Sequence, residues 1–226
     1  MKRLALLLAV LAAACVAPPA AGAAVVELGS LEGVTPGCPD PSTCYAIGRV
    51  TGYQVRAGSK RNPFRATQRG KIVAFSLALG KPDEEQTEFF NSLYGSPSKV
   101  QLVVLRPGSK RRHRLIGRSE VFEVNDYFGS TPTFALQRPL TMRRGYVAAI
   151  SVHTWIPSFA VGLPQTDAWR SSRDGENCDD VRTPAEQTRR GSLRTYGCLH
   201  RTARLLYSVT FVPDPPRVNR QKTTRR

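Results

Sequence analysis

Residues 72–79 have the sequence Ile-Val-Ala-Phe-Ser-Leu-Ala-Leu. Larger and smaller side chains alternate along this stretch, with Val73, Phe75, Leu77 and Leu79 on one face and Ala74, Ser76 and Ala78 on the other. Near the end of the chain the alternation returns, with Leu205, Tyr207, Val209 and Phe211 opposed by Ser208 and Thr210. A period of two is the spacing of a β-strand that buries one face. Both stretches therefore predict half-buried strands.

Further strand candidates lie between these two stretches. Residues 100–105 and 146–152 are apolar on both faces, as expected of strands in the centre of a sheet. Weaker candidates are residues 47–55, 115–124, 133–136 and 159–162. Clusters of Gly, Pro, Asn and Asp separate the candidates at fairly regular intervals. The pattern predicts an all-β protein, an antiparallel jelly-roll-like β-sandwich.

One short helix is expected at about residues 83–94. Asp83 can cap its N-terminus, and the acidic residues that follow suit the positive end of a helix. An apolar stripe follows, made of Phe89, Phe90, Leu93 and Tyr94, and Gly95 supplies a stop. We expect this stripe to close one end of the sandwich rather than to bind a ligand.

The first residues predict export from the cytoplasm. Met1-Lys2-Arg3 precedes an apolar run from Leu4 to Val16, and small residues at 21–23 suit cleavage, so residues 1–23 are typical of a secretory signal peptide. The run is about half the ~20 residues that span a bilayer, and no later segment approaches that length. The alternative is a lipoprotein signal with acylation of Cys15, although Ala12 stands where a branched apolar residue is usual. We expect an extracellular or cell-envelope protein.

The remaining chain is expected to form one domain. Residues 24–212 suffice for a single large β-sandwich and contain no internal repeat. Residues 213–226 are basic and rich in proline, with almost nothing to bury. They are predicted to form a disordered tail.

Four cysteines lie beyond residue 23. In an exported chain an even number indicates disulfides, and four cysteines allow three pairings. We favour Cys38–Cys44 and Cys178–Cys198, because each pair closes a local loop between turn-rich flanks. The second pair lies in residues 164–202, a polar stretch that is expected to be a long loop. A zinc site is the competing interpretation, but neither a C-x-x-C motif nor a matching histidine pair is present.

The charge is strongly positive. The chain has a formal net charge of +16, and +14 without Lys2 and Arg3. The basic residues form clusters that fall mostly at predicted turns, namely Lys60-Arg61 with Arg65, Arg69 and Lys71; Lys110-Arg111-Arg112 with Arg114; Arg143-Arg144; and Arg189-Arg190 with Arg194. A solvated surface explains such clusters, and so does attraction to an anionic polymer. No nucleic-acid-binding motif accompanies the charge, so we expect no specific nucleic-acid partner.

The strand series resembles the jelly-roll sandwiches of extracellular carbohydrate-binding and galactose-binding-like modules. The resemblance covers about residues 45–212 and depends on the segments 71–79 and 140–150 and on the closing strand. It concerns the architecture alone, and it assigns no functional residue, because sandwich folds carry many activities.

The candidate ligand-binding residues lie after residue 152. Trp155 and Trp169 offer flat apolar faces, and the same region contains Arg170, Tyr196 and His200. A sugar ring needs an aromatic platform with hydrogen-bonding groups around it. The competing interpretation is that both tryptophans are core residues, since tryptophan is highly buried on average.

Acidic residues suggest one further possibility. Asp174, Glu176, Asp179 and Asp180 lie in one turn-prone segment and offer oxygens to a calcium ion, although their spacing departs from the EF-hand pattern. Salt bridges with neighbouring arginines are the alternative. No other metal or cofactor is expected.

Sequence motifs for catalysis are missing. The chain contains no G-x-S-x-G, H-E-x-x-H, P-loop or G-x-G-x-x-G motif, and His113, His153 and His200 are widely scattered. We therefore expect no catalytic residues and a secreted, non-enzymatic, bacterial sandwich protein that binds a glycan or an anionic polymer of the cell envelope. The alternatives are a cell-surface structural or interaction protein without a small-molecule site, and a hydrolase whose active site lacks a recognisable motif.

Overall fold

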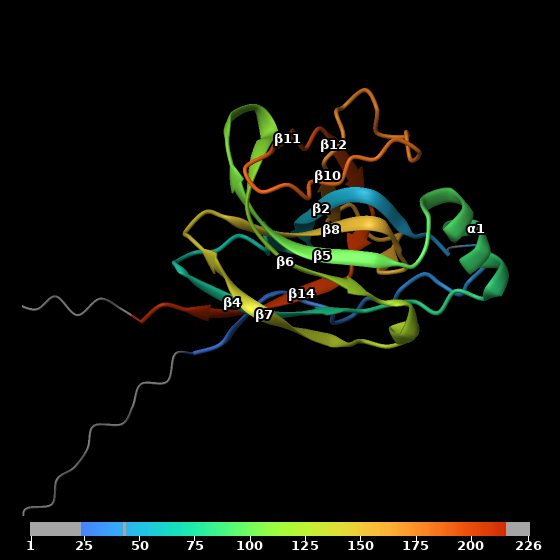
Figure 1. The fold of residues 1–226 in the computed structure, drawn as a ribbon, viewed down its shortest axis with the longest axis horizontal. Helices are drawn as coiled ribbons and strands as arrows, with labels where there is room; N and C mark the ends of the chain where they lie inside the picture. The colour runs from blue at the N-terminus through green and yellow to red at the C-terminus, as the bar shows by residue number, and fades with distance from the viewer. Residues whose placement is uncertain (1–23, 43, 216–226) are drawn as a thin grey trace, which may run out of the picture.

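The computed structural model describes residues 24–42 and 44–215. The predicted signal peptide with Cys15, and the predicted tail from residue 216 onward, lie outside the described residues. The protein is a sandwich of two antiparallel sheets, with a helix at one end and a long insertion above one sheet (Figure 1).

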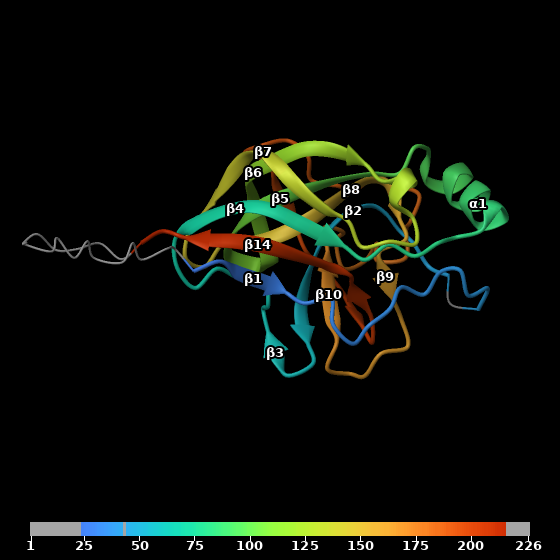
Figure 2. The same ribbon diagram turned by 90° about the horizontal axis from the view of Figure 1, so that it is seen from below.

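The first sheet has four strands and is seen from its outer side in Figure 2. Their order is β1 (Val26–Gly29), β14 (Tyr207–Pro213), β4 (Gly70–Leu77) and β7 (Thr133–Met142).

The second sheet has eight strands and is curled. Along its main path the order is β11 (Leu193–Thr195), β6 (Arg112–Glu123), β5 (Lys99–Pro107), β8 (Val147–Ile156), β2 (Ile47–Ala57), β10 (Ala168–Ser171) and β12 (Cys198–Arg201), and β3 (Lys60–Arg61) pairs with β2. A separate ribbon joins β9 (Phe159–Ala160) to β13 (Arg204–Leu205). Short 3-10 turns occur at Ser109–Arg111 and Asn125–Tyr127.

Eight of these strands form the jelly roll. Along the chain they pass from one sheet to the other at each step except between β5 and β6, which pair with each other in the second sheet. The resulting orders, β1-β14-β4-β7 and β2-β8-β5-β6, are the arrangement of two interlocked Greek keys. The predicted fold class, an all-β antiparallel sandwich with one inserted helix and a disulfide in the region after β8, is confirmed. Strands β5 and β8, predicted to be central, each pair with a neighbour on both sides.

The core fills the space between the two sheets. From β4 it receives Ile72, Phe75 and Leu77, all fully buried. Val73, which was expected on the buried face, is only half-buried, because the register of β4 against β7 shifts between Ile72 and Ala74. Such a bulge re-aims the side chains that follow it, so the simple alternation holds only from Phe75 onward.

The closing strand is split in the structure. Leu205 belongs to β13 and pairs with Phe159, whereas the strand that completes the first sheet starts at Tyr207. Tyr207 is fully buried and its ring stacks on Phe64 with centroids 3.9 Å apart. At its far end Pro213 still pairs with Gly70, and Asp214 forms an ion pair with Arg69.

Helix α1 (Glu84–Tyr94) follows from local chemistry, as expected. Asp83 accepts a hydrogen bond from the backbone N–H of Gln86, and the Gln86 side chain accepts one from the N–H of Asp83, which completes a capping box. At the other end Gly95 has φ of 91°, a conformation that favours glycine. Phe90 and Tyr94 are buried against β8, but Phe89 is 59% exposed, so the buried stripe is narrower than predicted.

Both predicted disulfides, Cys38–Cys44 and Cys178–Cys198, are present. Disulfides of this kind are typical of an oxidising compartment. Within the described part of the chain, no helix has the length and apolar character required to cross a bilayer.

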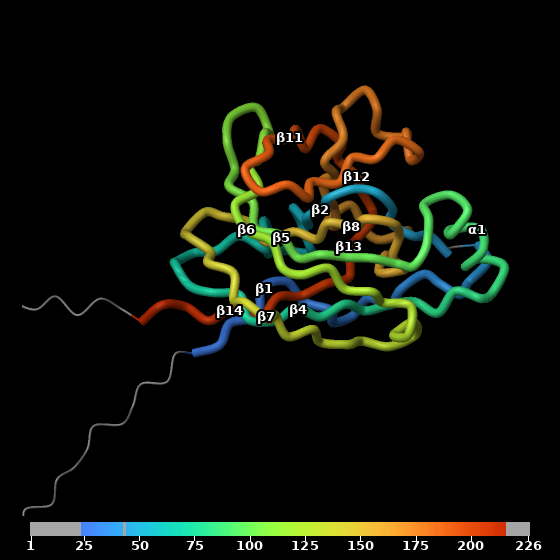
Figure 3. The backbone as a smooth tube through the Cα atoms, viewed as in Figure 1, coloured from blue at the N-terminus to red at the C-terminus, as the bar shows by residue number. Residues whose placement is uncertain are grey.

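The region between β8 and β14 is more ordered than the sequence suggests. Residues 164–202 were predicted to be a loop, yet they contain β10, β11 and β12, which extend the second sheet at both of its edges (Figures 1 and 3). These strands have four residues or fewer, and β11 is mostly exposed, so a period of two cannot be recognised in them. Strand β1, at the edge of the first sheet, was missed for the same reason.

Candidate functional site

A buried network of polar groups holds the insertion between β8 and β14 on the second sheet. The backbone N–H of Thr51 on β2 donates to Ser172 Oγ at 2.9 Å, and the Thr51 hydroxyl donates to Ser151 Oγ at 2.8 Å. Gln187 donates its backbone N–H to the Thr51 hydroxyl at 2.7 Å. All four residues are nearly inaccessible to solvent, and buried polar groups of this kind stabilise a structure only when they are satisfied.

Tyr196, one of the predicted ligand-binding residues, belongs to this network. It is fully buried, and its hydroxyl donates to Gln187 Oε1 at 2.9 Å. Its ring packs on Tyr53 and His113, whose Oη and Nε2 atoms share a hydrogen bond at 3.1 Å. Burial raises the pKa of Tyr53 to about 12 and lowers the pKa of His113. Tyr196 therefore offers no surface to a ligand in this structure.

Trp155 is also fully buried. It lies within β8, where its ring packs against Phe90 of the helix and against Phe128. Its Nε1 atom donates to Asn91 Oδ1 at 2.9 Å. Every part of the indole thus has a protein partner, and Trp155 fixes the helix to the sheet instead of forming an open platform.

Trp169 and His200 are brought together by the pairing of β10 with β12. The two residues are register partners, and their rings are stacked with centroids 4.2 Å apart. His200 Nε2 shares a hydrogen bond with Ser171 Oγ at 3.0 Å. Burial lowers the pKa of His200, and the nearby Asp179 opposes that shift. Ser171 is only 1% exposed, so its hydroxyl is not open to solvent in this structure.

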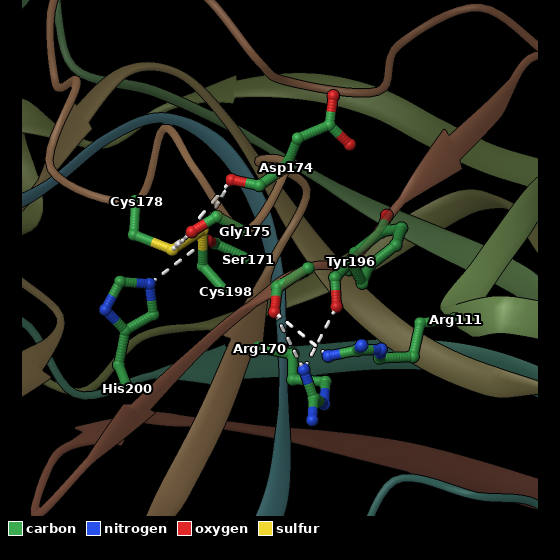
Figure 4. The surroundings of a disulfide bond; sticks show 10 residues. Arg111, Arg170, Ser171, Asp174, Gly175, Cys178, Tyr196, Cys198 and His200 are labelled. Atoms are coloured by element: carbon green, nitrogen blue, oxygen red, sulfur yellow. Dashed lines mark hydrogen bonds between the residues drawn. A yellow bond between two sulfur atoms is a disulfide. The ribbon is translucent and has the colours of Figure 1, made fainter.

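Arg170 lies on the other side of the second disulfide (Figure 4). Its Nη1 atom donates to the carbonyls of Tyr196 and Gly197, at 3.2 and 3.1 Å. Arg111 points toward the same Gly197 carbonyl (Figure 4). These contacts fix the chain ahead of Cys198. Arg170 thus contacts Tyr196 through its backbone carbonyl, and not across an open cleft.

A small pocket is present beside this disulfide. It has a volume of about 150 Å³ and is lined mainly by aromatic and aliphatic residues, including Tyr94, Phe159, Trp169, Val181 and His200. Gly48 forms part of its wall, where a Cβ atom would collide with the ring of Tyr94. Two of the predicted residues, Trp169 and His200, thus share a pocket, whereas Trp155 and Tyr196 do not line it.

The four acidic residues considered for calcium do not converge. Asp180 Oδ1 accepts hydrogen bonds from the backbone N–H groups of Arg182 and Thr183, and the bonds from Thr183 lower the pKa of its carboxyl. Asp174 and Asp180 line a second cavity, of about 330 Å³, together with Arg173 and Arg194. Over the described residues, no group of three or more His, Cys, Asp or Glu side chains is placed to hold a metal ion.

A third pocket joins two of the basic clusters. Arg61 at the end of β3, Arg65 between β3 and β4, and Arg144 in the turn between β7 and β8 line one cavity of about 540 Å³. No carboxylate is among the lining residues. Backbone hydrogen bonds hold the two segments together, from Gly145 N–H to the Ala66 carbonyl at 2.8 Å and from Ala66 N–H to the Tyr146 carbonyl at 2.9 Å. We call this the arginine pocket.

The geometry of the arginine pocket depends on its turn. Gly145 has φ of 85°, a left-handed conformation that side chains disfavour, and the Arg65 guanidinium lies beside it. All three arginines are exposed, and none of them forms an ion pair with a described residue. The sequence contained both clusters, but about eighty residues separate them, and only the packing of β4 beside the turn after β7 brings them to one place.

The turn after β7 and the start of β4 lie at the end of the sandwich opposite helix α1 (Figures 1 and 2). Strand β14 ends there too, because Pro213 pairs with Gly70. Five basic residues follow Pro213 in the sequence, namely Arg217, Arg220, Lys222, Arg225 and Arg226, and they lie outside the described residues. A hydrolase would need a histidine such as His153 beside a serine or a carboxylate in a pocket. His153 lines none of the three pockets described above. Burial lowers the pKa of His153, and the nearby Glu186 opposes that shift.

Comparison with protein-family models, with curated proteins and with solved structures finds no match to this chain.

Proposed function

We propose that this is an exported, non-enzymatic protein that binds an anionic polymer of the cell envelope through the arginine pocket. The observation that carries the proposal is the convergence of Arg61, Arg65 and Arg144 on one cavity with no acidic lining residue. Planar guanidinium groups bind phosphate, sulfate and carboxylate groups through paired hydrogen bonds.

The rest of the molecule supports a polymer in preference to a small anion. The arginine pocket is open and large, and the excess of positive charge extends beyond it. Three ion pairs occur among the described residues, so most of the arginines keep their charge available to a partner. A flexible anionic chain can occupy the pocket and run on over neighbouring exposed basic residues such as Lys60 and Arg143.

A polyanion is also a better candidate ligand than a neutral glycan. The aromatic platform that a neutral sugar requires is not offered by Trp155 or Tyr196, which are buried. Two disulfides fit an extracytoplasmic setting, in which polymers with repeating phosphate, sulfate or carboxylate groups are the anionic partners.

The test compares two triple variants with equal loss of charge. Arg61→Gln/Arg65→Gln/Arg144→Gln removes the arginine pocket, and Lys110→Gln/Arg112→Gln/Arg138→Gln removes three exposed basic residues that do not line it. Binding of the oxidised protein, residues 24–226, to heparin and to a glycerol-phosphate wall polymer is measured by fluorescence anisotropy at several salt concentrations.

We expect the pocket variant to lose about tenfold or more in affinity and about three units in the slope of log K against log salt, since each direct contact contributes about one. The control variant should lose clearly less. Equal losses in the two variants would show that binding depends on overall charge and not on the arginine pocket, and failure of the unmodified protein to bind either polymer would refute the proposal.

A further inference from the structure

The pocket beside the second disulfide has features that polymer binding at the arginine pocket does not explain. It is formed by five separate parts of the chain, namely β2, the end of α1, β9, the β10–β12 pair and the segment that follows β10 and contains Cys178. Its volume of about 150 Å³ is that of a cavity that accommodates one benzene molecule.

The lining of this pocket suits a flat ring. Trp169 is stacked on His200, and Phe159 meets the Trp169 ring edge-on with centroids 5.8 Å apart. Tyr94 adds a fourth ring, and aliphatic residues from the start of β2 complete the wall. Aromatic side chains in this arrangement bind another ring by stacking and edge-to-face contacts.

Arg173 adds a positive charge to this apolar site. The residue is only 6% exposed, and its Nη1 atom donates to the Thr183 carbonyl at 2.7 Å. Its Nη2 atom is buried and has no hydrogen-bond partner among the described residues. No carboxylate of the described residues lies within 4.0 Å of the guanidinium. Asp180 and Glu186 act on this charge only from beyond that distance. A buried charge without a direct ion-pair partner is unfavourable, and an anionic ligand would relieve it.

Trp169, which lines the same pocket, carries a second unpartnered donor. Trp169 Nε1 is buried and also has no partner among the described residues. The opposite edge of the indole, with Cε3 and Cζ3, lies against Gly52. Buried donors are normally satisfied. Both atoms have less than 1 Å² of accessible surface, so an acceptor atom of a ligand reaches them only when these side chains shift on binding.

Arg173 also lines the neighbouring cavity of about 330 Å³, but that cavity is a poorer site for an anion. Its lining includes Asp174 and Asp180, and its remaining residues are mostly polar. The pocket with Trp169 has no carboxylate in its lining. The apolar ring of a ligand and its anionic group are therefore both best accommodated there.

We infer that the pocket formed by Tyr94, Phe159, Trp169, Arg173 and His200 binds a small aromatic carboxylate. The ring occupies the aromatic cavity, and the carboxylate lies beside Arg173. A small shift of the two side chains on binding brings the unpartnered donors of Arg173 and Trp169 within hydrogen-bonding distance of it. A sugar acid fits less well, because its hydroxyl groups would face a mostly apolar wall.

The test uses benzoate as the probe and three comparison compounds. Benzyl alcohol has the ring without the charge, acetate has the charge without the ring, and glucuronate is a sugar acid. Binding to the oxidised protein, residues 24–226, is followed by calorimetry and by saturation-transfer NMR. We expect benzoate to bind at least about tenfold more tightly than benzyl alcohol, as a charge-assisted hydrogen bond would provide, and acetate and glucuronate to bind more weakly still.

Two variants locate the site without disturbing the core. Val181 lines the pocket and is 41% exposed, so Val181→Phe should obstruct the entrance and abolish benzoate binding. Val121→Phe is the matched control, because Val121 is 43% exposed and lies outside the pocket on β6. Arg173→Met should remove the preference for benzoate over benzyl alcohol while retaining weak binding of both rings.

The outcomes separate this inference from the proposed function. Val181→Phe should leave heparin binding unchanged, and the triple variant of the arginine pocket should leave benzoate binding unchanged. Three results would each overturn the inference. The first is equal binding of benzoate to the Val181→Phe protein, and the second is loss of benzoate binding in the triple variant of the arginine pocket. The third is failure of benzoate to bind the unmodified protein at about 10 millimolar, which is about the weakest affinity worth measuring.

Discussion

The jelly roll and the insertion between β8 and β14 are stabilised by different forces. The jelly roll encloses a continuous apolar core, in which residues such as Phe75, Leu102 and Ile150 have no exposed surface. The insertion, residues 157–206, adds some apolar residues to that core, such as Trp169 and Leu205. It also buries a polar network around Thr51 and Gln187 and is closed by the Cys178–Cys198 disulfide. Hydrophobic burial is not directional, whereas a polar network requires each partner in place, so the two regions should respond differently to the same kind of damage.

The largest effect should come from the core of the jelly roll. Phe75→Ala removes a fully buried ring that contacts Phe122 and Phe134, and we expect a loss of about 3–5 kcal/mol in the free energy of unfolding. Phe89→Ala is the matched control, because Phe89 is mostly exposed on α1. Urea unfolding measures both. A small effect of Phe75→Ala would mean that the two sheets are not packed as described.

The next effect concerns the disulfide of the insertion. Replacing Cys178 and Cys198 by serine opens a link across 20 residues, and the chain-entropy relation gives a loss of about 3 kcal/mol. We expect hydrogen exchange to show lost protection for residues 172–197 while the amides of β5 and β8 stay protected. The serine variant of Cys38–Cys44, which spans 6 residues, should leave residues 172–197 protected. Uniform loss over the whole domain in the first variant would show that the two regions unfold together.

A smaller effect is expected from a single hydroxyl in the polar network. Tyr196→Phe leaves the Gln187 Oε1 atom without its donor in a buried place, and an unsatisfied buried acceptor costs about 1–3 kcal/mol. Tyr45→Phe serves as the control, since Tyr45 is exposed. If chemical denaturation finds the two substitutions equally mild, the network does not hold the insertion in the way that its hydrogen bonds indicate.

The smallest effect should be a response to acid. Burial lowers the pKa of His113 and of His200 below the ordinary 6.5, so between the folded and unfolded values the unfolded chain binds more protons. Stability is therefore complete above pH 6.5 and falls as the pH decreases below it. Hydrogen exchange at pH 7.5 and at pH 5 should show the insertion loosening first, because Tyr196 and Trp169 pack on these two rings. Replacing His113 by glutamine should reduce the difference between the two conditions, and an unchanged difference would contradict this origin.

Much of the jelly roll was predictable because its strands obey local rules. Phe75 and Leu77 face the core as their spacing indicates, and Asp83 and Gly95 mark the ends of the helix through capping chemistry that involves only nearby residues. The disulfide pairs were predictable for the same reason, since each closes a short loop. The bulge at Ile72 was not predictable, because it arises from the register against β7.

The candidate sites were less accessible to sequence reasoning. Nothing in the sequence distinguishes Trp155 from Trp169 as a candidate for ligand binding. In the structure Trp155 is buried under the helix, whereas Trp169 lines a pocket. Burial depends on what the rest of the chain places above a side chain, and that is a property of contacts between distant residues. Arg173 lines this pocket and has an unpartnered donor, but in the sequence it is only one arginine among many in a polar stretch.

By itself the sequence determined the class of fold, the ends of the helix, the two disulfides and the excess of positive charge, because alternation, capping, short loop closure and composition act locally or over the whole chain. Only the tertiary structure decided that Arg61, Arg65 and Arg144 meet in one pocket and that Trp169 and Arg173 share another. The physical reason is that a binding site is made by strand order and register, which bring together residues that lie far apart along the chain.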